Sequence, residues 1–364
     1  MAQIKPFRAL RYTEKAGEIK TLVSPPYDII PPSDYGKYTG ASAYNVIRAE
    51  HPSAAYTENI YDNAAQFVKS AIAEGILAED TDRSVYVYEI EYSGKRVKGF
   101  IPLVKLEEFS KGIILPHEET LSKAKADRFE LMKATGANFS QIYSLYSDEG
   151  GTVSELLNKV STRKPDIEFT DKDDNNNTHR LWAVTDTAVL TALETAFADK
   201  KLYIADGHHR YETAINYRNY LNELGTYAPK AAYIPMMLVA LENEGLTVLP
   251  THRICRNLKD YNWDWVIEHV KGDFEVTPYL NREKGEVGLA EAYKAGKTAF
   301  VYFTGNNNYT LLVLKDKGVM KKYLPDVSDA LRGLDVSVLH TLILERLFGI
   351  DKANMAAGNN LSYT

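Results

Sequence analysis

A pair of strand-like segments joined by a tight turn limits the possible folds more than any other feature of the sequence. Residues 84–92 (SVYVYEIEY) alternate between the two faces of a strand, and residues 97–106 return after the turn Ser93-Gly94-Lys95. This pattern predicts a β-hairpin, and a hairpin requires antiparallel pairing. A regular array of βαβ units with an all-parallel sheet is therefore excluded.

Helices and strands are interspersed along the rest of the chain. The spacing of apolar residues predicts helices over 54–77, 121–134, 153–160, 187–198, 207–224, 263–270, 287–295 and 336–347. We expect strands at 139–146, 201–205, 231–241, 246–252 and 274–277, two short strands around the polar loop 171–177, and a second hairpin over 298–314. Residues 1–53 contain two Pro-Pro pairs, which rule out a long helix there. The expected fold class is α+β, with mixed or antiparallel sheets and flanking helices.

The length of 364 residues suggests two domains, at about 150 residues per domain. Gly150-Gly151 and the polar loop 171–177 are the best places for a boundary. We expect an N-terminal α+β region over 1–150 and a C-terminal one over 151–364, or else one intertwined unit.

Charge and cysteine content narrow the class of protein. The chain has 43 Lys and Arg against 49 Asp and Glu, a net charge of −6, which argues against a protein that wraps nucleic acid. The single cysteine, Cys255, excludes an internal disulfide and a Cys-rich zinc site. The longest near-apolar run, 233–241, is far shorter than the ~20 residues of a membrane span. We expect a cytoplasmic protein without a membrane or nucleic-acid partner, and leave a homodimer open.

The common signatures of nucleotide and hydrolase sites are missing from the sequence. It contains no G-x-x-x-x-G-K-[ST], no G-x-G-x-x-G after a strand, no H-E-x-x-H and no G-x-S-x-G. A function has to be inferred from other clusters of reactive residues.

The strongest candidate site lies where a predicted strand turns directly into a helix. The strand at 201–205 ends at Asp206, and Gly207, His208, His209 and Arg210 open the helix. Glycine permits a tight turn, and the first helical turn offers free N–H groups and a positive dipole. Cations are unfavourable there unless an anion joins them, so the cluster predicts a phosphate or carboxylate site.

The helix phase places Arg210 at the head of an apolar stripe. This stripe continues through Ala214, Tyr217, Leu221 and Leu224. An arginine on a buried face needs a partner, which a bound anion would supply. The plainer interpretation stays open: Asp206 is an N-cap, His208 is solvated and Arg210 pairs with a structural glutamate.

A second cluster has the same form. The apolar run 113–115 is followed by Pro116, His117, Glu118 and Glu119, and then by a predicted helix carrying Lys123, Lys125, Asp127 and Arg128. Arg128 shares an apolar stripe with Leu121, Ala124 and Leu131. The cluster is consistent with a general base and a phosphate clamp. Alternatively, Lys123 and Asp127 form a surface i,i+4 pair.

Three further positions are weaker candidates. Tyr27 and Asp28 lie in a rigid loop between the Pro-Pro pairs, and Arg253 follows His252 at the end of a predicted strand. His340 lies on the apolar stripe of the last helix, where a core histidine is the commoner case.

Several of these segments together resemble a bacterial and archaeal family of unknown function, domain of unknown function 1015 (DUF1015). The matching stretches span nearly the whole chain: SPPYD (24–28), PHEET (116–120), KADR (125–128), NFSQIYSLY (138–146), ADGHHRYETA (205–214), PTHR (250–253) and LDVSVLH (334–340). Membership of such a family implies no activity by itself.

The segment 205–214 is also similar to the phosphate-binding box of the ParB/sulfiredoxin superfamily. The box residues correspond here to Gly207, Arg210, Tyr211 and Ala214. The Asp-Gly-His-His-Arg form resembles the archaeal free-serine kinases of that superfamily, which transfer a phosphoryl group from a nucleotide to free L-serine. This resemblance implies a ParB/sulfiredoxin-like core around residues 201–224. The chain is longer than those kinases, so the substrate stays open.

The resulting hypothesis is a nucleotide-dependent phosphotransferase acting on a small hydroxyl compound, for example free L-serine. It needs Mg²⁺ and ATP or ADP as donor. The expected catalytic residues are Asp206, Glu118 and His209, with Glu118 as general base and Asp206 also as the Mg²⁺ ligand. The expected phosphate-binding residues are Gly207, His208, Arg210, Lys123 and Arg128, and the expected substrate-binding residues are Asp28, Tyr27, His117 and Arg253.

Two other functions stay open. A ParB-like regulatory module would bind or slowly hydrolyse a nucleotide without phosphorylating a small molecule. A metal-dependent hydrolase would use Asp206, His208, His117 and Glu118 around one ion. All three functions are simplest if the clusters at 117–128 and 205–214 share one pocket.

Overall fold

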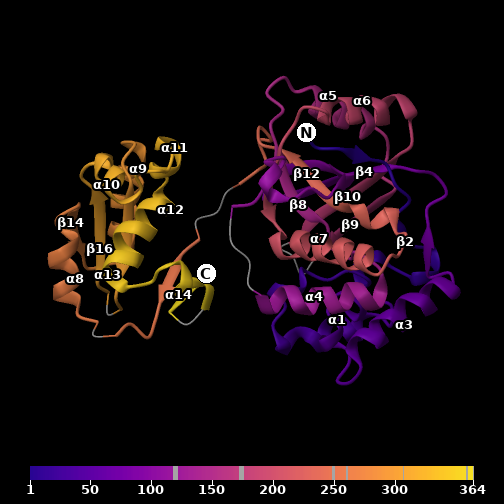
Figure 1. Ribbon diagram of the computed structural model, residues 1–364, viewed down its shortest axis with the longest axis horizontal. Coiled ribbons are helices and arrows are strands. Elements are labelled where there is room, and N and C mark those ends of the chain that lie inside the picture. The colour runs from indigo at the N-terminus through magenta and orange to yellow at the C-terminus, as the bar shows by residue number, and fades with distance from the viewer. Residues whose placement is uncertain are drawn as a thin grey trace. The chain divides into compact units, whose positions relative to one another are not determined.

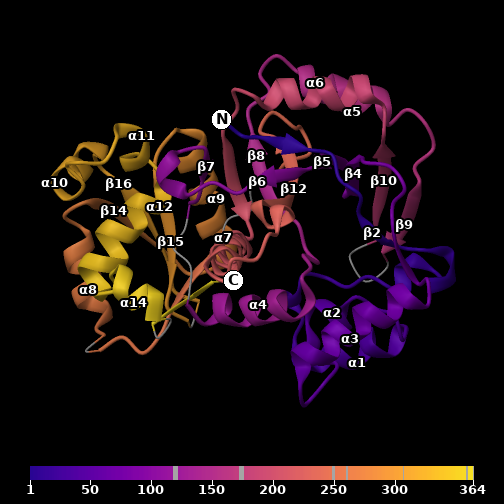
Figure 2. The same ribbon diagram turned by 45° about the vertical axis from the view of Figure 1, so that its right-hand side comes forward.

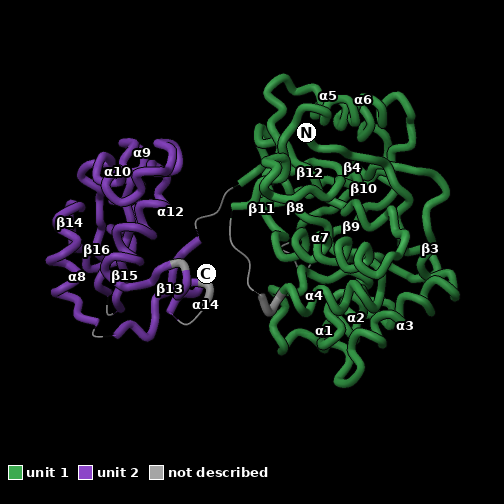
Figure 3. The backbone as a smooth tube through the Cα atoms, viewed as in Figure 1, with its two compact units in different colours: residues 1–248 green, residues 249–364 purple. Residues whose placement is uncertain are grey.

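The computed structural model describes residues 1–117, 122–171, 176–247, 251–259, 261–305, 307–357 and 360–363. The chain forms two compact units, residues 1–248 and 249–364 (Figure 3). The expected division after residue 150 falls inside the first unit, because strands on both sides of that position pair in one sheet. Within the described parts of the chain, no helix is both long and apolar enough to cross a membrane.

Among its described residues, the first unit is built on a mixed sheet of ten strands. Their main order is β7-β11-β8-β12-β5-β4-β10-β9, and β6 joins β12 to β1. The pairs β7/β11 and β8/β12 are parallel and the other pairs are antiparallel. The strands are β1 (Ile4–Lys5), β4 (Val85–Tyr92), β5 (Lys95–Ile101), β6 (Leu103–Lys105), β7 (Ile114–Leu115), β8 (Ile142–Tyr146), β9 (Ile167–Asp171), β10 (Asn177–Val184), β11 (Leu202–Asp206) and β12 (Tyr233–Ala240).

The predicted hairpin is confirmed as β4 and β5, which pair from Tyr92 opposite Lys95 to Tyr86 opposite Ile101. Its second strand is shorter than predicted. Pro102 has no N–H to donate to the ladder, and the next residues form the separate strand β6, which pairs with β12.

Gly99 of β5 lies against the backbone of β12. A Cβ atom there would come within 2.3 Å of the Leu238 carbonyl oxygen. We expect Gly99→Ala to lower the free energy of unfolding by about 1–3 kcal/mol, because a central-strand carbonyl has little room to move. Gly36→Ala is the control, since a Cβ at Gly36 meets nothing within 4 Å. Equal urea midpoints for the two variants would contradict this close approach.

Helices cover both faces of this sheet (Figures 1 and 2). On one face lie α5 (Thr152–Val160) and α6 (Thr187–Phe197), and on the other lies α7 (His208–Glu223). Next to α7 packs α4 (Ser122–Thr135), followed by the N-terminal helices α1 (Tyr35–Ala41), α2 (Ile47–Glu50) and α3 (Ile60–Ala73), with a small strand pair β2 (Leu10–Tyr12) and β3 (Leu77–Glu79). The arrangement confirms the α+β class with a mixed sheet and flanking helices.

The buried face of α7 differs from the predicted stripe. Its buried residues include His208, Tyr211 and Ala214, whereas Leu224 is exposed. Phe129 of α4 contacts Tyr220 of α7 edge to face, and Leu224 lies one turn beyond this contact. The stripe was therefore correct for Ala214 and wrong at the C-terminal end of the helix.

The second unit contains an antiparallel sheet in the order β14-β16-β15. Its core includes Val270, Phe274, Leu312 and Leu342. The elements are β13 (Arg253–Cys255), α8 (Trp263–Val270), β14 (Phe274–Tyr279), α9 (Arg282–Lys294), β15 (Ala299–Phe303), β16 (Tyr309–Leu314), α10 (Met320–Tyr323), α11 (Asp329–Arg332), α12 (Asp335–Val338), α13 (Arg346–Phe348), α14 (Lys352–Ala357) and β17 (Leu361–Tyr363). Strands β13 and β17 pair with each other.

Two predicted elements of the C-terminal half differ from the structure. The helix expected over 336–347 is continuous but widens into π-helical turns over Leu339–Glu345. The strand expected at 246–252 does not form at Leu246 or Thr247, and residues 248–250 lie outside the described residues. Instead, the hydroxyl of Tyr92 donates to the Gly245 carbonyl at 2.6 Å, which holds this turn against the hairpin.

Candidate functional site

The turn between β11 and α7 has the tight geometry that the sequence predicts. Gly207 has a φ of 92°, a conformation that side chains other than glycine rarely adopt. A Cβ at this position would lie 3.0 Å from the guanidinium carbon of Arg210, which folds back over the turn. Arg210 donates to the Asp206 carboxylate and, at 2.6 Å, to the carbonyl of Gln141. Its ion-pair partner is thus the aspartate that ends the preceding strand, β11.

The two clusters predicted from the sequence are in contact. The backbone N–H of His117 donates to Nε2 of His208 at 3.3 Å, and the two imidazole rings lie 4.5 Å apart, nearly perpendicular. Lys125 of α4 also pairs with Glu212 of α7 at 2.6 Å. The contact arises because β7 runs parallel to β11, so the residues that follow both strands emerge at the same edge of the sheet.

A small cavity of about 40 Å³ lies beside this turn. It collects residues from four segments that are far apart in the sequence. Its polar lining consists of Tyr27, Glu50, Arg128, Asn138, Ser140, Arg210 and Thr213. The structure thus brings the candidates Tyr27, Arg128 and Arg210 together at one place.

Arg128 is only 8% exposed, as its place on the apolar stripe predicts. It donates to the Glu50 carbonyl at 2.6 Å and to the carboxylate of the neighbouring Asp127. Its guanidinium lies over the ring of Tyr27, 4.0 Å from the centroid. Asp127 also accepts from the hydroxyl of Tyr61 at 2.9 Å. The described partners of Asp127 are therefore Arg128 and Tyr61, and the side chain of Lys123 lies outside the described residues.

Glu50 is the ionisable residue of this cavity that sequence reasoning missed. It is the last residue of α2 and is 7% exposed, and the Ser140 hydroxyl donates to its carboxylate. Burial raises the pKa of Glu50 from 4.5 to about 7, although the charges of Arg210 and Arg128 oppose the shift. A helix of four residues has no periodicity to reveal which side is buried, so the sequence carries no clear signal for it.

The hydroxyl of Thr213 completes the polar wall of the cavity. Thr213 is fully buried, and its Oγ1 has no hydrogen-bond partner among the residues that the structure describes. A buried hydroxyl of this kind costs free energy unless a ligand or water satisfies it. The cavity is thus chemically suited to a polar ligand.

The other predicted site residues are placed less centrally. Asp28 is exposed, and its charge adds to the rise in the pKa of Glu50. His209 is half-buried on α7. Glu118 lies outside the described residues. Arg253 belongs to β13 of the second unit, where burial, and after it the charge of Arg253, lowers the pKa of His340.

Possible metal ligands are sparse in the described parts of the chain. No group of three His, Cys, Asp or Glu residues there is placed to hold one ion. The carboxylate of Asp206 is 66% exposed and reaches solvent at the turn. A single exposed carboxylate fits Mg²⁺ that arrives with a nucleotide, because Mg²⁺ keeps several waters and phosphate oxygens as ligands.

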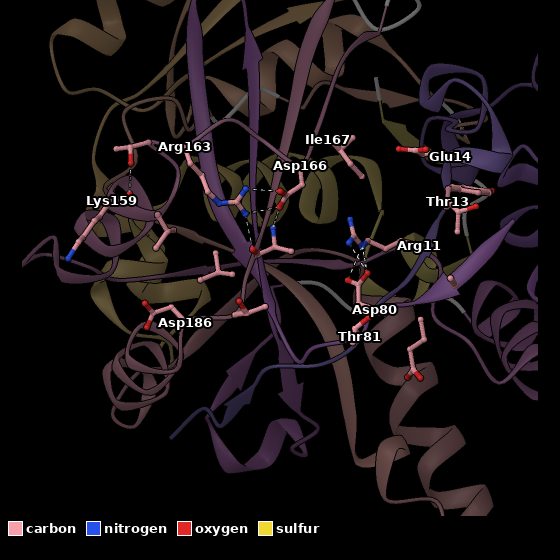
Figure 4. A pocket seen from close by; sticks show the side chains of 18 residues that line it. Arg11, Thr13, Glu14, Asp80, Thr81, Lys159, Arg163, Asp166, Ile167 and Asp186 are labelled. Carbon is pink, nitrogen blue, oxygen red and sulfur yellow. Dashed lines mark hydrogen bonds and ion pairs between the residues drawn. The ribbon is translucent and has the colours of Figure 1, made fainter. Parts of the chain in front are cut away.

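A larger open groove of about 1190 Å³ lies elsewhere on the first unit (Figure 4). Two of its arginines form ion pairs with aspartates of the same groove: Arg11 pairs with Asp80 at 2.7 Å, and Arg163 pairs with Asp166 at 2.6 Å. None of the predicted site residues lines it. The smaller cavity is the better candidate site, since three predicted site residues line it and it holds a buried hydroxyl without a hydrogen-bond partner among the described residues.

The family assignment is supported over most of the chain. The model of a family described as "Protein of unknown function (DUF1015)" matches residues 4–337. The chain belongs to the DUF1015 family. A solved structure, a conserved hypothetical protein from Pyrococcus furiosus, matches with 15% identity over 70% of this chain and 76% of that chain, at a TM-score of 0.24. No curated protein matches the chain.

In this DUF1015 protein, the segments that carry the family resemblance separate into two groups. In the first unit, the segments 24–28, 125–128, 138–146 and 205–214 each contribute a residue to the wall of the small cavity, whereas Pro116 and His117 do not line it and residues 118–120 lie outside the described residues. The segments 250–253 and 334–340 belong to the second unit. The likeness to the ParB/sulfiredoxin box rests on residues 205–214 alone.

Proposed function

We propose that this DUF1015 protein is a nucleotide-dependent phosphotransferase that acts on a small hydroxyl compound, with free L-serine as the first compound to test. The observation that supports it is the convergence of four distant segments on one cavity that holds two guanidinium groups and a buried carboxylate. Phosphoryl transfer depends mainly on positioning and charge compensation. A small, cation-lined cavity at the start of a helix supplies both.

The phosphate end of the donor would bind at the β11–α7 turn, in the manner of a ParB/sulfiredoxin-like core. Free N–H groups of the first turn of α7 and the guanidinium of Arg210 are the donors available there. Gly207 lets the backbone approach the phosphate closely, since it carries no side chain. His208 is buried against His117, and this contact holds the first turn of α7 against the segment that follows β7.

The acceptor would occupy the cavity itself. Arg128, held by Asp127 and the Glu50 carbonyl, presents a positive charge that balances a carboxylate or the transferred phosphate. Tyr27 forms a flat wall beneath it. A volume of about 40 Å³ would receive the hydroxyl-bearing end of a small acceptor.

Asp206 is the residue that would hold Mg²⁺ bound to the nucleotide. When bound, the ion would neutralise part of the negative charge of the phosphates. The chain's own contribution is the position of the carboxylate, next to Arg210 and at the exposed end of β11.

A transfer screen tests the proposal. The purified chain is incubated with Mg²⁺ and terminally labelled ATP or ADP, with and without L-serine, other hydroxyl amino acids and polyols. We expect label to appear on one acceptor. Nucleotide binding or hydrolysis without transfer to any acceptor would favour the regulatory module instead. Absence of nucleotide binding, measured by calorimetry, would contradict both.

A further inference from the structure

We infer that the carboxylate of Glu50, rather than that of Glu118, accepts the proton of the acceptor hydroxyl during phosphoryl transfer. The inference rests on the proposed function, because it assigns a base to that reaction. It is drawn from the contacts of Glu50 in the cavity.

The position of Glu50 meets the geometric need of a general base. Its carboxylate lies in the same cavity as Arg210, and Arg210 in turn contacts Asp206 and the β11–α7 turn. The guanidinium of Arg210 therefore lies between the proposed phosphate site at the turn and the cavity that holds the Glu50 carboxylate. A base must lie within hydrogen-bond reach of the hydroxyl while the phosphate lies on the other side of it.

The cavity already places one hydroxyl group, that of Ser140, at this carboxylate. The hydroxyl of Ser140 donates a hydrogen bond to Oε1 of Glu50, so an O–H group inside the cavity can reach this carboxylate. The hydroxyl of Thr213 lines the same cavity and has no partner among the described residues. An acceptor hydroxyl bound between Thr213 and Glu50 would satisfy Thr213 and deliver its proton to the carboxylate.

The charges that face Glu50 come from three elements. The 3-10 turn Tyr27–Ile29 contributes Asp28, α4 contributes Arg128 and α7 contributes Arg210. Burial outweighs the two arginines, and the pKa of Glu50 rises to about 7. A base with a pKa near the working pH combines a large ionised fraction with a useful affinity for the proton.

The proposed step balances in atoms and charge. The acceptor oxygen forms a bond to the terminal phosphorus of a nucleoside di- or triphosphate, and its proton moves to Glu50. The bond from that phosphorus to the bridging oxygen breaks, and the electron pair leaves on the shortened nucleotide. The products are a phosphate monoester and a nucleotide with one phosphate fewer, and Glu50 later returns the proton to water.

The test compares Glu50→Gln with a matched change at Glu107. Both glutamates are 7% exposed, but Glu107 lies outside the cavity and pairs with Lys111. We expect Glu50→Gln to lower kcat by about 10²- to 10⁴-fold and to remove the rise of kcat with pH around neutrality. Nucleotide affinity should stay within about threefold, because the lost group acts in the chemical step. Glu107→Gln should keep both the rate and the pH profile.

Glu118→Gln decides between the two candidate bases. If it removes the rise with pH while Glu50→Gln keeps it, the inference is overturned and the phosphotransferase function stands. A wild-type chain that phosphorylates no acceptor contradicts the proposed function itself.

An independent readout covers the case in which Glu50→Gln changes stability. The folded state disfavours ionised Glu50, so wild-type stability should fall as pH rises from about 4.5 to about 7. Glu50→Gln should lack this fall. Equal pH dependence in the two chains would show that Glu50 does not titrate near neutrality, which also overturns the inference.

Discussion

Arg210→Ala is expected to lower kcat/KM for phosphate transfer by about 10²- to 10³-fold, the usual effect of losing one preorganised donor to a transferring group. Arg210 covers Gly207 and joins the turn to the cavity, so its loss removes a positive charge from both. The nucleotide dissociation constant, measured by calorimetry, should rise together with the loss in rate.

The matched control for this change is Arg218→Ala on the same helix. Arg218 pairs with Glu108 at 2.6 Å and lines neither the turn nor the small cavity. Its removal should leave transfer and nucleotide affinity as in the wild type. If Arg210→Ala matched Arg218→Ala in both measurements, the phosphate would have to bind elsewhere on the chain.

Tyr211→Ala is expected to lower the free energy of unfolding by about 3–5 kcal/mol, as for other large-to-small changes of buried aromatic residues. Tyr211 is fully buried in the core of the first unit and stacks on Phe109, with ring centroids 5.2 Å apart. The ring belongs to the main core cluster of the first unit, so its removal leaves a cavity in that core. Urea-induced unfolding followed by circular dichroism measures the loss.

Tyr211→Phe removes the hydroxyl and keeps the ring, so it measures the contribution of the hydroxyl to stability separately. The hydroxyl donates to the Glu107 carbonyl at 2.7 Å and accepts from the Glu107 N–H at 2.9 Å. Its removal leaves a buried donor and acceptor unsatisfied, so we expect a loss of about 1–3 kcal/mol. Tyr203→Phe on β11, which is 43% exposed, should change stability by less than about 0.5 kcal/mol. An equal effect at both tyrosines would contradict this role of the hydroxyl.

The sequence predicts those features of the fold that depend on neighbouring residues. The β4–β5 hairpin follows from alternation and a Gly turn, and the β11–α7 unit follows from an apolar strand that ends at Asp206-Gly207. The burial of Arg128 follows from its helical phase. In each case the pattern lies within about twenty residues, where periodicity is informative.

The cavity could not be predicted, because distant pairings create it. Glu50 reaches Ser140 only through the packing of α2, and a four-residue helix shows no periodic pattern. The division at 248 was missed for a related reason. Strands on both sides of residue 150 pair with each other, and local composition does not report such long-range partners.

The ion pair between Arg210 and Asp206 makes anion capture an exchange reaction rather than a simple addition. An incoming anion has to take over a guanidinium that a carboxylate already occupies. A singly charged anion gains little over the carboxylate it displaces, whereas a phosphate with two negative charges gains more from the same cation. If the proposed phosphate site is correct, the ion pair would favour anions of higher charge, and the released carboxylate would become free to bind the cation that accompanies the phosphate.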